Sequence, residues 1–518
     1  MRFRNRTRIG ALVTALAAVS LLSSCGSDKI VYRDRPPFNP PPDSVNGFLG
    51  LFDVATNQTT CGNCHVGHQR DWKTSGHAGA FATLVNSGHA SATCYGCHTV
   101  SEHGNLAPAP AGWNRVQDSA YRNVQCESCH GPGLNHVSEP DLPGNVPLAH
   151  VTLTDTAASC ASCHSGVHEP FAEEWAQSGH AQIVTSAASQ TGCASCHDGR
   201  QVLVAWNADA RYAERNGTSP LPTTCAVCHD PHGSPNESQL RFSISSPDPE
   251  QNLCMRCHIR RTEPAGGSAN GVRPHAPQGA VLLGTAGYRP AGFAYDTSRI
   301  FTSHASERNP RLCAGCHVNR YTVTDQATGA FVLNSTGHLF RPIPCLDSQG
   351  RPTADDSCAF NTTARSFAAC SNSGCHASGD AAASALINLR ARLKTLADVL
   401  WQDVNGNQTI DAGVDLGYLP TVKGTSPSQF APDTVITAAE GAEFNARLVG
   451  EGLYGNGDKS LGVHNPFLAE ALLRASIQEM QTTYSLPAPP PAAARILQAP
   501  MPGAGPQAAG VQKIISLR

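Results

Sequence analysis

The chain has 518 residues, a formal net charge of −3 and only 6% aromatic residues, against 47 glycines and 37 prolines. Few aromatic side chains and many turn formers predict a loop-rich polypeptide, in which bound cofactors supply much of the apolar core. The near-neutral charge comes without a basic patch, so nucleic-acid binding is excluded as the expected function.

The N-terminus has the pattern of a bacterial export signal. Four arginines between positions 2 and 8 precede an apolar stretch at 9–22, and Leu22-Ser-Ser-Cys25 resembles a lipobox. We expect a signal peptide at 1–24, acylation of Cys25 and a tether to the outer membrane, because Gly26 stands where an inner-membrane retention signal has Asp. The alternative is an ordinary signal peptide with an incidental cysteine. Residues 25–60 are rich in proline and predict a lipid-anchored, extended tether.

The dominant pattern is Cys-x-x-Cys-His. Two thiols at this spacing can each bond a vinyl group of one haem, and the histidine that follows lies close enough to coordinate the iron. A ninth motif has four residues between Cys370 and Cys375 before His376. Structural zinc is the alternative, but zinc does not need a histidine directly after every second cysteine. For the ninth motif, the alternative is a disulfide of Cys370 with Cys375, or of both with Cys345 and Cys358.

The motifs predict nine covalently attached haems. The predicted attachment residues are Cys61, Cys64, Cys94, Cys97, Cys126, Cys129, Cys160, Cys163, Cys193, Cys196, Cys225, Cys228, Cys254, Cys257, Cys313, Cys316, Cys370 and Cys375. The predicted proximal iron ligands are His65, His98, His130, His164, His197, His229, His258, His317 and His376.

Motifs one to three recur as motifs four to six. Their first cysteines lie 99 residues apart in each case, and Trp72-Lys-Thr-Ser-Gly-His77 is answered by Trp175-Ala-Gln-Ser-Gly-His180. Self-similarity at a fixed period indicates an internal duplication. We therefore predict a three-haem module at 61–159, a second at 160–253, and a looser region with haems seven to nine at 254–378.

The second axial ligand of each iron separates an electron carrier from an enzyme. The chain has 22 histidines and only four methionines, so bis-histidine ligation is expected. This ligation gives a lower reduction potential than His/Met ligation and leaves no open position on the iron for a substrate. For four histidines, a ligand role and a surface role both stay open: His68, His103, His150 and His168. The predicted distal ligands are His77, His89, His136, His180, His232, His275, His304, His338 and His464, the last as the partner of His376.

Helical patterning begins after Gly379, and 379–484 is predicted to be a C-terminal helical domain. Leucines from Leu386 to Leu400 recur at steps of three and four and form an apolar stripe that packs on the haem domain or on a partner helix. A second helix is expected from Thr437 to Val449 and a third from Pro466, capped by Asn465. Residues 485–518 are rich in proline, alanine and glycine and predict a disordered tail.

Two smaller features complete the pattern. In an exported protein Cys345 and Cys358 should form a disulfide, the alternative being two unpaired thiols. Residues Asp403 to Asp411 resemble a calcium loop but lack the usual glycine and the acidic twelfth residue, so an Asn/Gly-rich turn is the alternative to Ca²⁺.

The expected fold is mainly α with extensive loops, a multihaem cytochrome c array with a duplicated three-haem module. On its Trp-x-x-Ser-Gly-His-Ala elements, 61–340 resembles the multihaem cytochrome c superfamily, most closely members related to the tetrahaem electron acceptor of hydroxylamine oxidoreductase. Gly-Val-His464-Asn-Pro resembles C-terminal regions of related proteins, including pentahaem nitrite reductases. The resemblance implies stacked haems, low-potential electron transfer and periplasmic haem attachment. The nitrite reductase motif Cys-x-x-Cys-Lys is missing from the sequence.

These features predict an outer-membrane lipoprotein that relays electrons between membrane donors and periplasmic or extracellular acceptors, with no catalytic residue of its own. The expected partners are other redox proteins, such as an outer-membrane porin or periplasmic cytochromes. The alternative is a multihaem reductase acting on nitrite, hydroxylamine or a sulfur oxyanion, which needs a haem with an open distal position. A third interpretation is a subunit that docks through its C-terminal helices.

Overall fold

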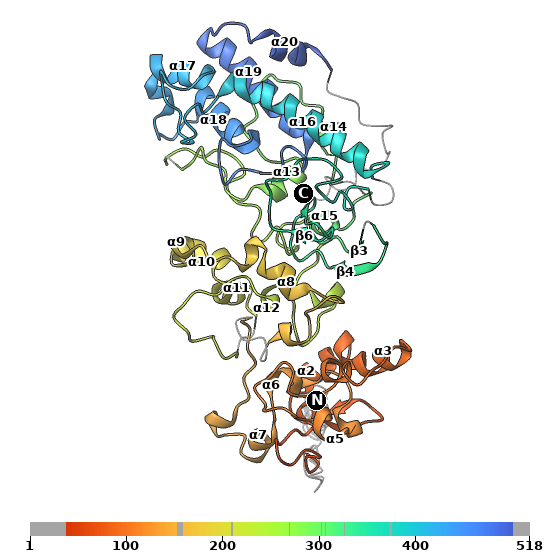
Figure 1. Ribbon diagram of the computed structural model, residues 1–518. Coiled ribbons are helices and arrows are strands. Elements are labelled where there is room, and N and C mark those ends of the chain that lie inside the picture. Colours follow the sequence, from red (N-terminus) through yellow and green to blue (C-terminus); the bar gives the residue numbers. More distant parts are fainter. Residues whose placement is uncertain are drawn as a thin grey trace, which may run out of the picture. The chain divides into compact units, whose positions relative to one another are not determined.

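Most motif cysteines lie on single turns of helix. The computed structural model describes residues 38–152, 159–208, 211–268, 270–301, 303–305, 307–325, 327–371 and 375–500. One helical turn places residues three and four apart on the same face, so it brings both thiols and the histidine of a motif to one side. The extended parts of the chain between these turns account for the loop-rich appearance (Figure 1).

Short helices predominate before residue 320. They are α2 (Val66–Trp72), α3 (Ala80–Asn86), α4 (Tyr95–His98), α5 (Trp113–Val116), α6 (Cys126–His130), α7 (Leu134–Ser138), α8 (Phe171–Ala176), α9 (Thr185–Ala188), α10 (Thr191–His197), α11 (Gly199–Ala205), α12 (Cys225–Cys228), α13 (Gln278–Leu282), α14 (Thr297–Ile300) and α15 (Cys313–His317). Motifs one and four begin on 3-10 turns, at Cys61–Asn63 and Cys160–Ser162.

The described residues form three small antiparallel sheets of two strands each. These pair β1 (Leu51–Asp53) with β2 (Gln58–Thr59), β3 (Tyr321–Thr324) with β4 (Phe331–Ser335), and β5 (Cys345–Leu346) with β6 (Pro352–Thr353). The disulfide predicted between Cys345 and Cys358 is present, with an S–S distance of 1.98 Å, and it closes the loop that contains β6.

The two predicted modules share a hydrogen-bond pattern. The Trp72 indole donates to the carbonyl of Val124 at 2.9 Å, and the Trp175 indole donates to the carbonyl of Thr223 at 2.8 Å. Val124 also donates its N–H to the His77 carbonyl at 3.2 Å, and Thr223 donates its N–H to the His180 carbonyl at 3.1 Å. These matching contacts hold each Ser-Gly-His element beside the third motif of its module.

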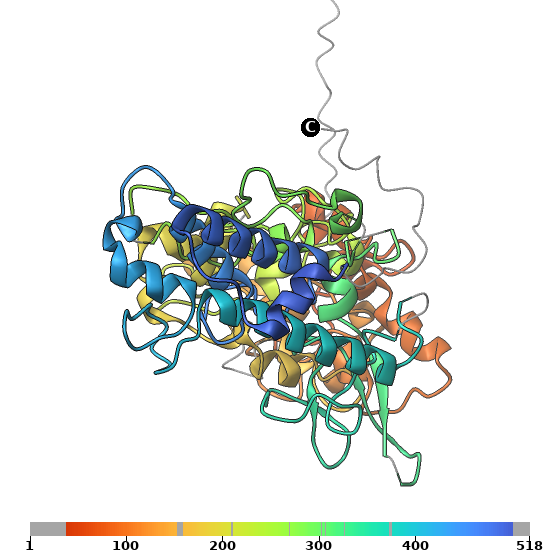
Figure 2. The same cartoon turned by 90° about the horizontal axis from the view of Figure 1, so that it is seen from above.

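The C-terminal helices are α16 (Gly379–Leu400), α17 (Tyr418–Thr425), α18 (Ala438–Val449), α19 (Pro466–Tyr484) and α20 (Pro491–Gln498). The leucine stripe of α16 is buried against α18 and α19, in the cyan and blue parts of Figures 1 and 2. The predicted cap at Asn465 is confirmed, because its side chain accepts the N–H of Leu468. The helix α18 is capped by Thr437, whose side chain accepts the N–H of Glu440. The stripe is therefore covered inside the chain and not presented to another protein.

These helices share a second core with the segment that follows the seventh motif. Val281 of α13 and Ile300 of α14 pack against Phe444, Leu468 and Leu472 of α18 and α19. In addition, the Asn465 side chain donates to the Ile300 carbonyl at 2.9 Å. The C-terminal helices are thus fixed to the chain around motifs seven to nine.

The prediction of a disordered tail from residue 485 is wrong for 491–498, which form α20. Ala493 is buried in the same core as α16, and the Arg474 guanidinium donates to the carbonyls of Ile496, Leu497 and Ala499. Pro491 at the first helical position and the alanines after it are favourable for a helix start. Residues 501–518, like the signal peptide, Cys25 and most of the tether, lie outside the described part.

A search of the described residues finds no helix with the length and apolar character needed to cross a membrane.

The buried stripe gives a stability prediction. Leu396 in α16 is fully buried, whereas Ile387 on the same helix is 48% exposed. Leu396→Ala should lower the free energy of unfolding by about 2–5 kcal/mol, because it removes core packing and leaves a cavity. The matched control Ile387→Ala should change it by no more than about 0.5 kcal/mol. Urea unfolding followed by circular dichroism measures both, and equal losses would contradict the internal packing of the stripe.

Candidate haem sites

Eight of the nine motif histidines lie across from a histidine outside the motifs, with ring centres 6.0–6.4 Å apart. The pairs are His65 with His136, His130 with His232, His164 with His77, His197 with His275, His229 with His338, His258 with His180, His317 with His464, and His376 with His304. The two rings of a pair come from segments far apart in the sequence.

This spacing fits an iron between the two rings. A metal–imidazole bond of about 2 Å, plus the roughly 1.1 Å from nitrogen to ring centre, places two opposed imidazole centres about 6.2 Å apart. A direct stacking contact would be shorter, like the 4.3 Å between His68 and His232. The residues present therefore fit haem iron held by two imidazoles.

The hydrogen bonds of the rings leave the correct nitrogen for a metal. Nδ1 of His130, His229 and His317 lies 2.7–2.8 Å from a backbone carbonyl oxygen. A ring that donates from Nδ1 keeps its lone pair on Nε2, which faces the opposite ring and can bind iron. Nδ1 of His98 is 3.0 Å from the Ala80 carbonyl and fixes that ring in the same way.

Burial keeps several of the opposed rings neutral. Desolvation, together with the neighbouring histidines, lowers the pKa of His77, His180 and His338 to about 4. Burial lowers the pKa of His317 to about 4 as well. Neutral imidazole is the form that coordinates a metal, so at neutral pH these four rings need not lose a proton to bind iron.

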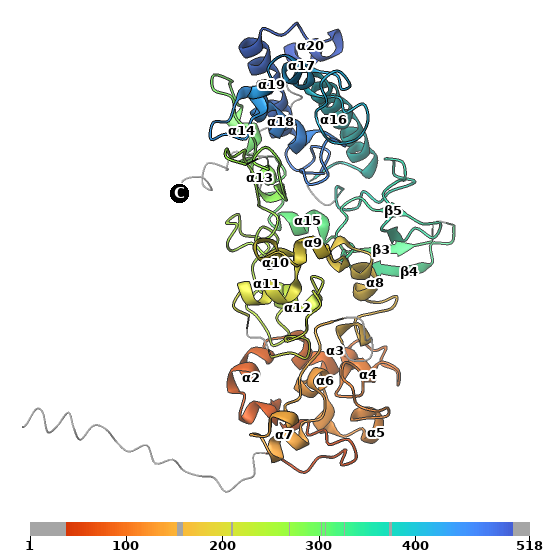
Figure 3. The ribbon, with the colours of Figure 1, turned by 90° about the vertical axis from the view of Figure 1, so that its left-hand side faces the viewer.

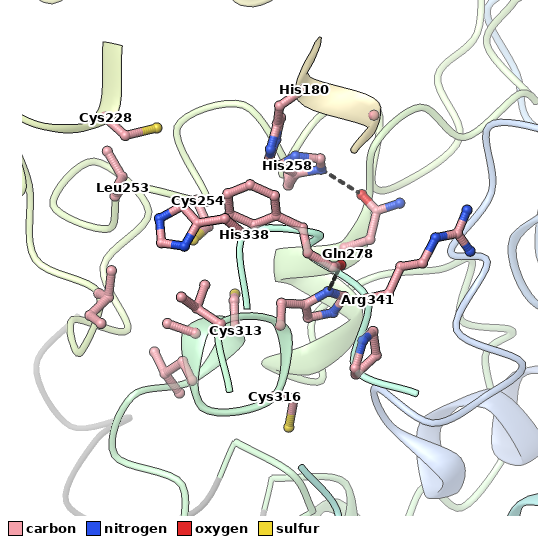
Figure 4. Close-up of a pocket in the computed structure, with 18 of the residues that line it drawn as sticks. His180, Cys228, Leu253, Cys254, His258, Gln278, Cys313, Cys316, His338 and Arg341 are labelled. Carbon is pink, nitrogen blue, oxygen red and sulfur yellow. Dashed lines mark hydrogen bonds between the residues drawn. The ribbon is translucent and has the colours of Figure 1, made fainter. Parts of the chain in front are cut away.

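A continuous cavity of about 4530 Å³ is lined by residues of motifs two to nine. Cavities for single drug-sized ligands measure roughly 300–1,000 Å³, so this space is large enough for several bulky groups. Figure 4 shows part of it, where the rings of His180 and His258 lie close together and the sulfur atoms of Cys254 and Cys313 line the same space. The chain's own side chains do not fill the space between the motifs.

The second motif differs from the other eight. Within the described residues, no histidine ring lies across from His98 at a comparable distance. His89, the predicted distal ligand in the nearest Ser-Gly-His element, is exposed, and its N–H donates to the Ser87 hydroxyl at 3.1 Å. The same three-residue context therefore gives a partly buried, paired ring at His77 and a surface ring at His89.

The four histidines whose roles were open occupy different places. The His68 ring lies 6.3 Å from His65, so His65 faces two rings, from His68 and His136. His150 contacts Glu214 at 3.0 Å. His103 lies beside Gly96, and His168 stacks on Phe331 with ring centres 6.2 Å apart.

The distal partner expected for the ninth motif is different in the structure. His464 lies opposite His317 of the eighth motif, and the ring opposite His376 is His304. The assignment of His464 to His376 is therefore wrong in this geometry. In the ninth motif the His376 N–H donates to the Cys370 carbonyl at 3.1 Å; residues 372–374 lie outside the described part.

Thiols of different motifs lie close together. Five pairs are in hydrogen-bonding contact: Cys61 with Cys126, Cys97 with Cys163, Cys160 with Cys225, Cys196 with Cys257, and Cys254 with Cys313. Thiols of three further motif pairs are near enough to interact electrostatically: motifs three and four through Cys129 and Cys160, motifs six and seven through Cys228 and Cys254, and motifs eight and nine through Cys316 and Cys375. Through these contacts each motif adjoins at least one other.

No sequence pattern pointed to Glu174, which positions one of the paired rings. This buried carboxylate in α8 accepts the N–H of Thr336 at 3.0 Å, its hydroxyl at 2.7 Å and the N–H of His338 at 2.7 Å. The contacts hold the end of β4 beside α8 (Figure 3) and aim His338 at His229. Glu174 is the fourth residue of an ordinary short helix, with no motif around it.

The described residues contain no group of three or more His, Cys, Asp or Glu side chains placed to hold a metal ion by themselves. In the predicted calcium loop, Asp411 accepts the side-chain amides of Asn405 and Asn407, at 3.0 and 2.7 Å. Asp415 points inward and accepts the Trp401 indole at 2.9 Å. The loop is thus closed by its own hydrogen bonds, and calcium binding stays a prediction.

Comparisons with known proteins agree with these sites. The family model described as cytochrome c554 and c-prime matches residues 60–131, which hold motifs one to three, and the doubled CXXCH motif matches 219–262, which hold motifs six and seven. The C-type polyheme cytochrome OmcC of Geobacter sulfurreducens is 26% identical over 266 residues, 44% of this chain and 33% of the relative. The multiheme cytochrome MtrA of Shewanella baltica is 25% identical over 249 residues, 44% of this chain and 66% of the relative.

The undecaheme cytochrome from the S-layer of Carboxydothermus ferrireducens is a structural neighbour with a TM-score of 0.43 and 17% identity, covering 86% of this chain and 70% of that one. The chain spans only 33% to 66% of the lengths of the two sequence relatives. Motifs and family matches together define a c-type cytochrome with covalently bound haem. The chain belongs to the multihaem c-type cytochromes.

The role of Glu174 gives a second prediction. Glu174→Gln should raise amide hydrogen exchange at Thr336 and His338 by about tenfold or more, because the amide replaces one acceptor oxygen by a donor and costs about 1–3 kcal/mol of local stability. The matched control is Glu173→Gln, whose side chain is exposed and accepts only the Gly166 N–H. Hydrogen exchange with mass spectrometry measures both, and unchanged protection in Glu174→Gln would remove the positioning role.

Proposed function

We propose that this protein is a nine-haem electron-transfer protein. The observation that carries the proposal is the continuous set of thiol contacts between motifs. Each attachment cysteine bonds directly to the edge of its haem, so motifs whose thiols are neighbours hold their haems close to one another. When bound, the haems supply reversible one-electron chemistry at iron, and the chain determines their order, spacing and environment.

The thiol contacts define an order for the haems. Motifs one, three, four, six, seven, eight and nine follow one another as a trunk, through Cys61–Cys126, Cys129–Cys160, Cys160–Cys225, Cys228–Cys254, Cys254–Cys313 and Cys316–Cys375. Motif two branches from motif four through Cys97–Cys163, and motif five branches from motif seven through Cys196–Cys257. An electron can therefore cross the array through seven haems, with two beside the path.

We assign the opposed histidines as distal ligands of the haems that they face. His77 and His180 then serve the first motif of the following module, which supports the duplication of a three-haem unit together with the matching Trp72 and Trp175 hydrogen bonds. Six-coordinate iron of this kind exchanges electrons without binding substrate and has a low reduction potential. The ring geometry thus favours an electron carrier.

The lipobox and the tether support an outer-membrane lipoprotein that faces the periplasm or the cell surface. Its proposed partners are other redox proteins, among them periplasmic cytochromes or a porin of the outer membrane. Calcium at Asp403–Asp411 is proposed only as an accessory structural ion, whose removal by a chelator would loosen the turn after α16.

Spectroscopy of the oxidised protein tests the electron-carrier function. We expect a mature mass that includes nine haems, a spectrum in which low-spin ferric haem accounts for at least eight of them, and no turnover of nitrite, hydroxylamine or sulfite. Any high-spin signal should come from the haem of motif two, because His98 is the motif histidine without an opposed ring in the described part of the chain.

Two variants locate the signals. Cys375→Ala should leave the ninth haem attached by a single bond or absent, which the mass resolves. His338→Ala should convert one haem, that of His229, from low to high spin. A wild-type spectrum dominated by high-spin haem, together with turnover of one of these substrates, would contradict the electron carrier and favour the reductase.

The membrane tether gives a further prediction. Cys25→Ser should move the protein from the membrane fraction to the soluble periplasmic fraction without changing its haem content, because acylation at Cys25 is the proposed anchor. Fractionation of cells and metabolic labelling with a fatty acid measure this. A Cys25→Ser variant that stays unlabelled and membrane-bound would show that another contact holds the protein there.

A further inference from the structure

One nine-residue segment, 457–465, contacts the ligand sets of three haems. The Gln278 amide donates to the carbonyls of Gly457 and Asp458 at 3.3 and 3.5 Å, and its oxygen lies 3.4 Å from Nδ1 of His258, the contact dashed in Figure 4. The Val463 carbonyl accepts from Nδ1 of His304. The segment therefore links the sites of motifs seven and nine, and it supplies His464 to motif eight between them.

The ring of His464 is held by a buried carboxylate. Its Nδ1 lies 2.6 Å from Oδ1 of Asp458, whose side chain is only 5% exposed. The Ser460 hydroxyl donates to the other oxygen of this carboxylate, and the Ser460 oxygen accepts the His464 N–H at 3.1 Å. Asp458 and Ser460 thus fix both the orientation and the tautomer of the ring, with Nε2 left toward His317.

This arrangement is unusual among the opposed rings. Nδ1 of His130, His229, His304 and His317 bonds to neutral backbone carbonyls. Two other opposed rings contact a carboxylate, His164 with Glu169 at 3.0 Å and His232 with Asp230 at 3.6 Å, but those carboxylate side chains are 53% and 30% exposed. Water screens an exposed charge, whereas a buried charge acts at nearly full strength on its partner.

We propose that Asp458 is a positioning residue that lowers the reduction potential of the haem at motif eight. A carboxylate that accepts the Nδ1 hydrogen raises the basicity of Nε2, and a more basic ligand stabilises ferric over ferrous iron. The inference rests on the proposed electron-transfer function. Motif eight lies between seven and nine in the trunk, so every electron that travels the whole path must pass this site. Asp458 would make the haem of motif eight a low-potential site that limits the rate of electron transfer along the trunk.

The test is a spectroelectrochemical titration of the fully haem-loaded protein. Asp458→Asn keeps an acceptor oxygen of the same shape but removes the charge, so one haem should shift to a higher potential while the other haems keep theirs. Electron paramagnetic resonance should show altered g values for a single low-spin ferric haem. Glu169→Gln, at the exposed carboxylate, is the matched control and should produce a clearly smaller shift.

A second variant tests the effect of Asp458 on the haem potential if Asp458→Asn loads haem poorly. Ser460→Ala keeps the carboxylate but removes its hydroxyl donor, so the charge on Asp458 is less neutralised and the same haem should shift to a lower potential. Unchanged potentials and g values in either loaded variant would overturn the role of Asp458 while leaving the electron carrier intact. The proposed function would fail separately, through a wild-type protein with too few haems or with high-spin iron.

Discussion

Two imidazoles about 6 Å apart are the constraint on which the rest of this structure depends. The rings of a pair come from segments at least 71 residues apart, as for His65 and His136, and up to 147 apart, as for His317 and His464. An iron between them would act as a cross-link. A cross-link that closes a long loop lowers the conformational entropy of the unfolded chain, and this loss of entropy increases only slowly with loop length. A chain with few aromatic residues can in this way hold together long stretches that lack regular structure.

The local parts of this arrangement could be predicted from the sequence, because they depend on residues close together in the chain. Cys-x-x-Cys-His determines which residues share a helical turn, and Asn465 before Pro466 determines where α19 starts. The leucine stripe likewise predicted the buried face of α16. In each case the physical cause lies within a few residues of the feature.

The distal partners could not be derived in the same way. Ser-Gly-His occurs at both His77 and His89, yet one ring is partly buried opposite His164 and the other is exposed. The difference comes from chain elements far away in the sequence. His464 was assigned to the wrong motif for the same reason, because the path of 457–465 past His304 depends on the packing of α13 and α14 against α19. The helix α20 was missed because its composition resembles that of a flexible tail, while the contacts of Arg474 that hold it are tertiary.

In the proposed array, the positions of the opposed histidines would make the haem sites of different modules depend on one another. The Ser-Gly-His elements of His77 and His180 are each fixed to the third motif of their own module by a tryptophan and a backbone contact, but the ring of His77 faces motif four and the ring of His180 faces motif seven. A module by itself would therefore contain a distal histidine whose haem belongs to another module, and a haem whose distal histidine belongs to another module. Duplication of such a module would lengthen the electron path without creating separable domains. The first haem site of each added module would take its distal histidine from the module before it. The C-terminal helices do the same for motif eight, through His464, and Asp458 then acts on an iron whose other ligand belongs to a distant part of the chain.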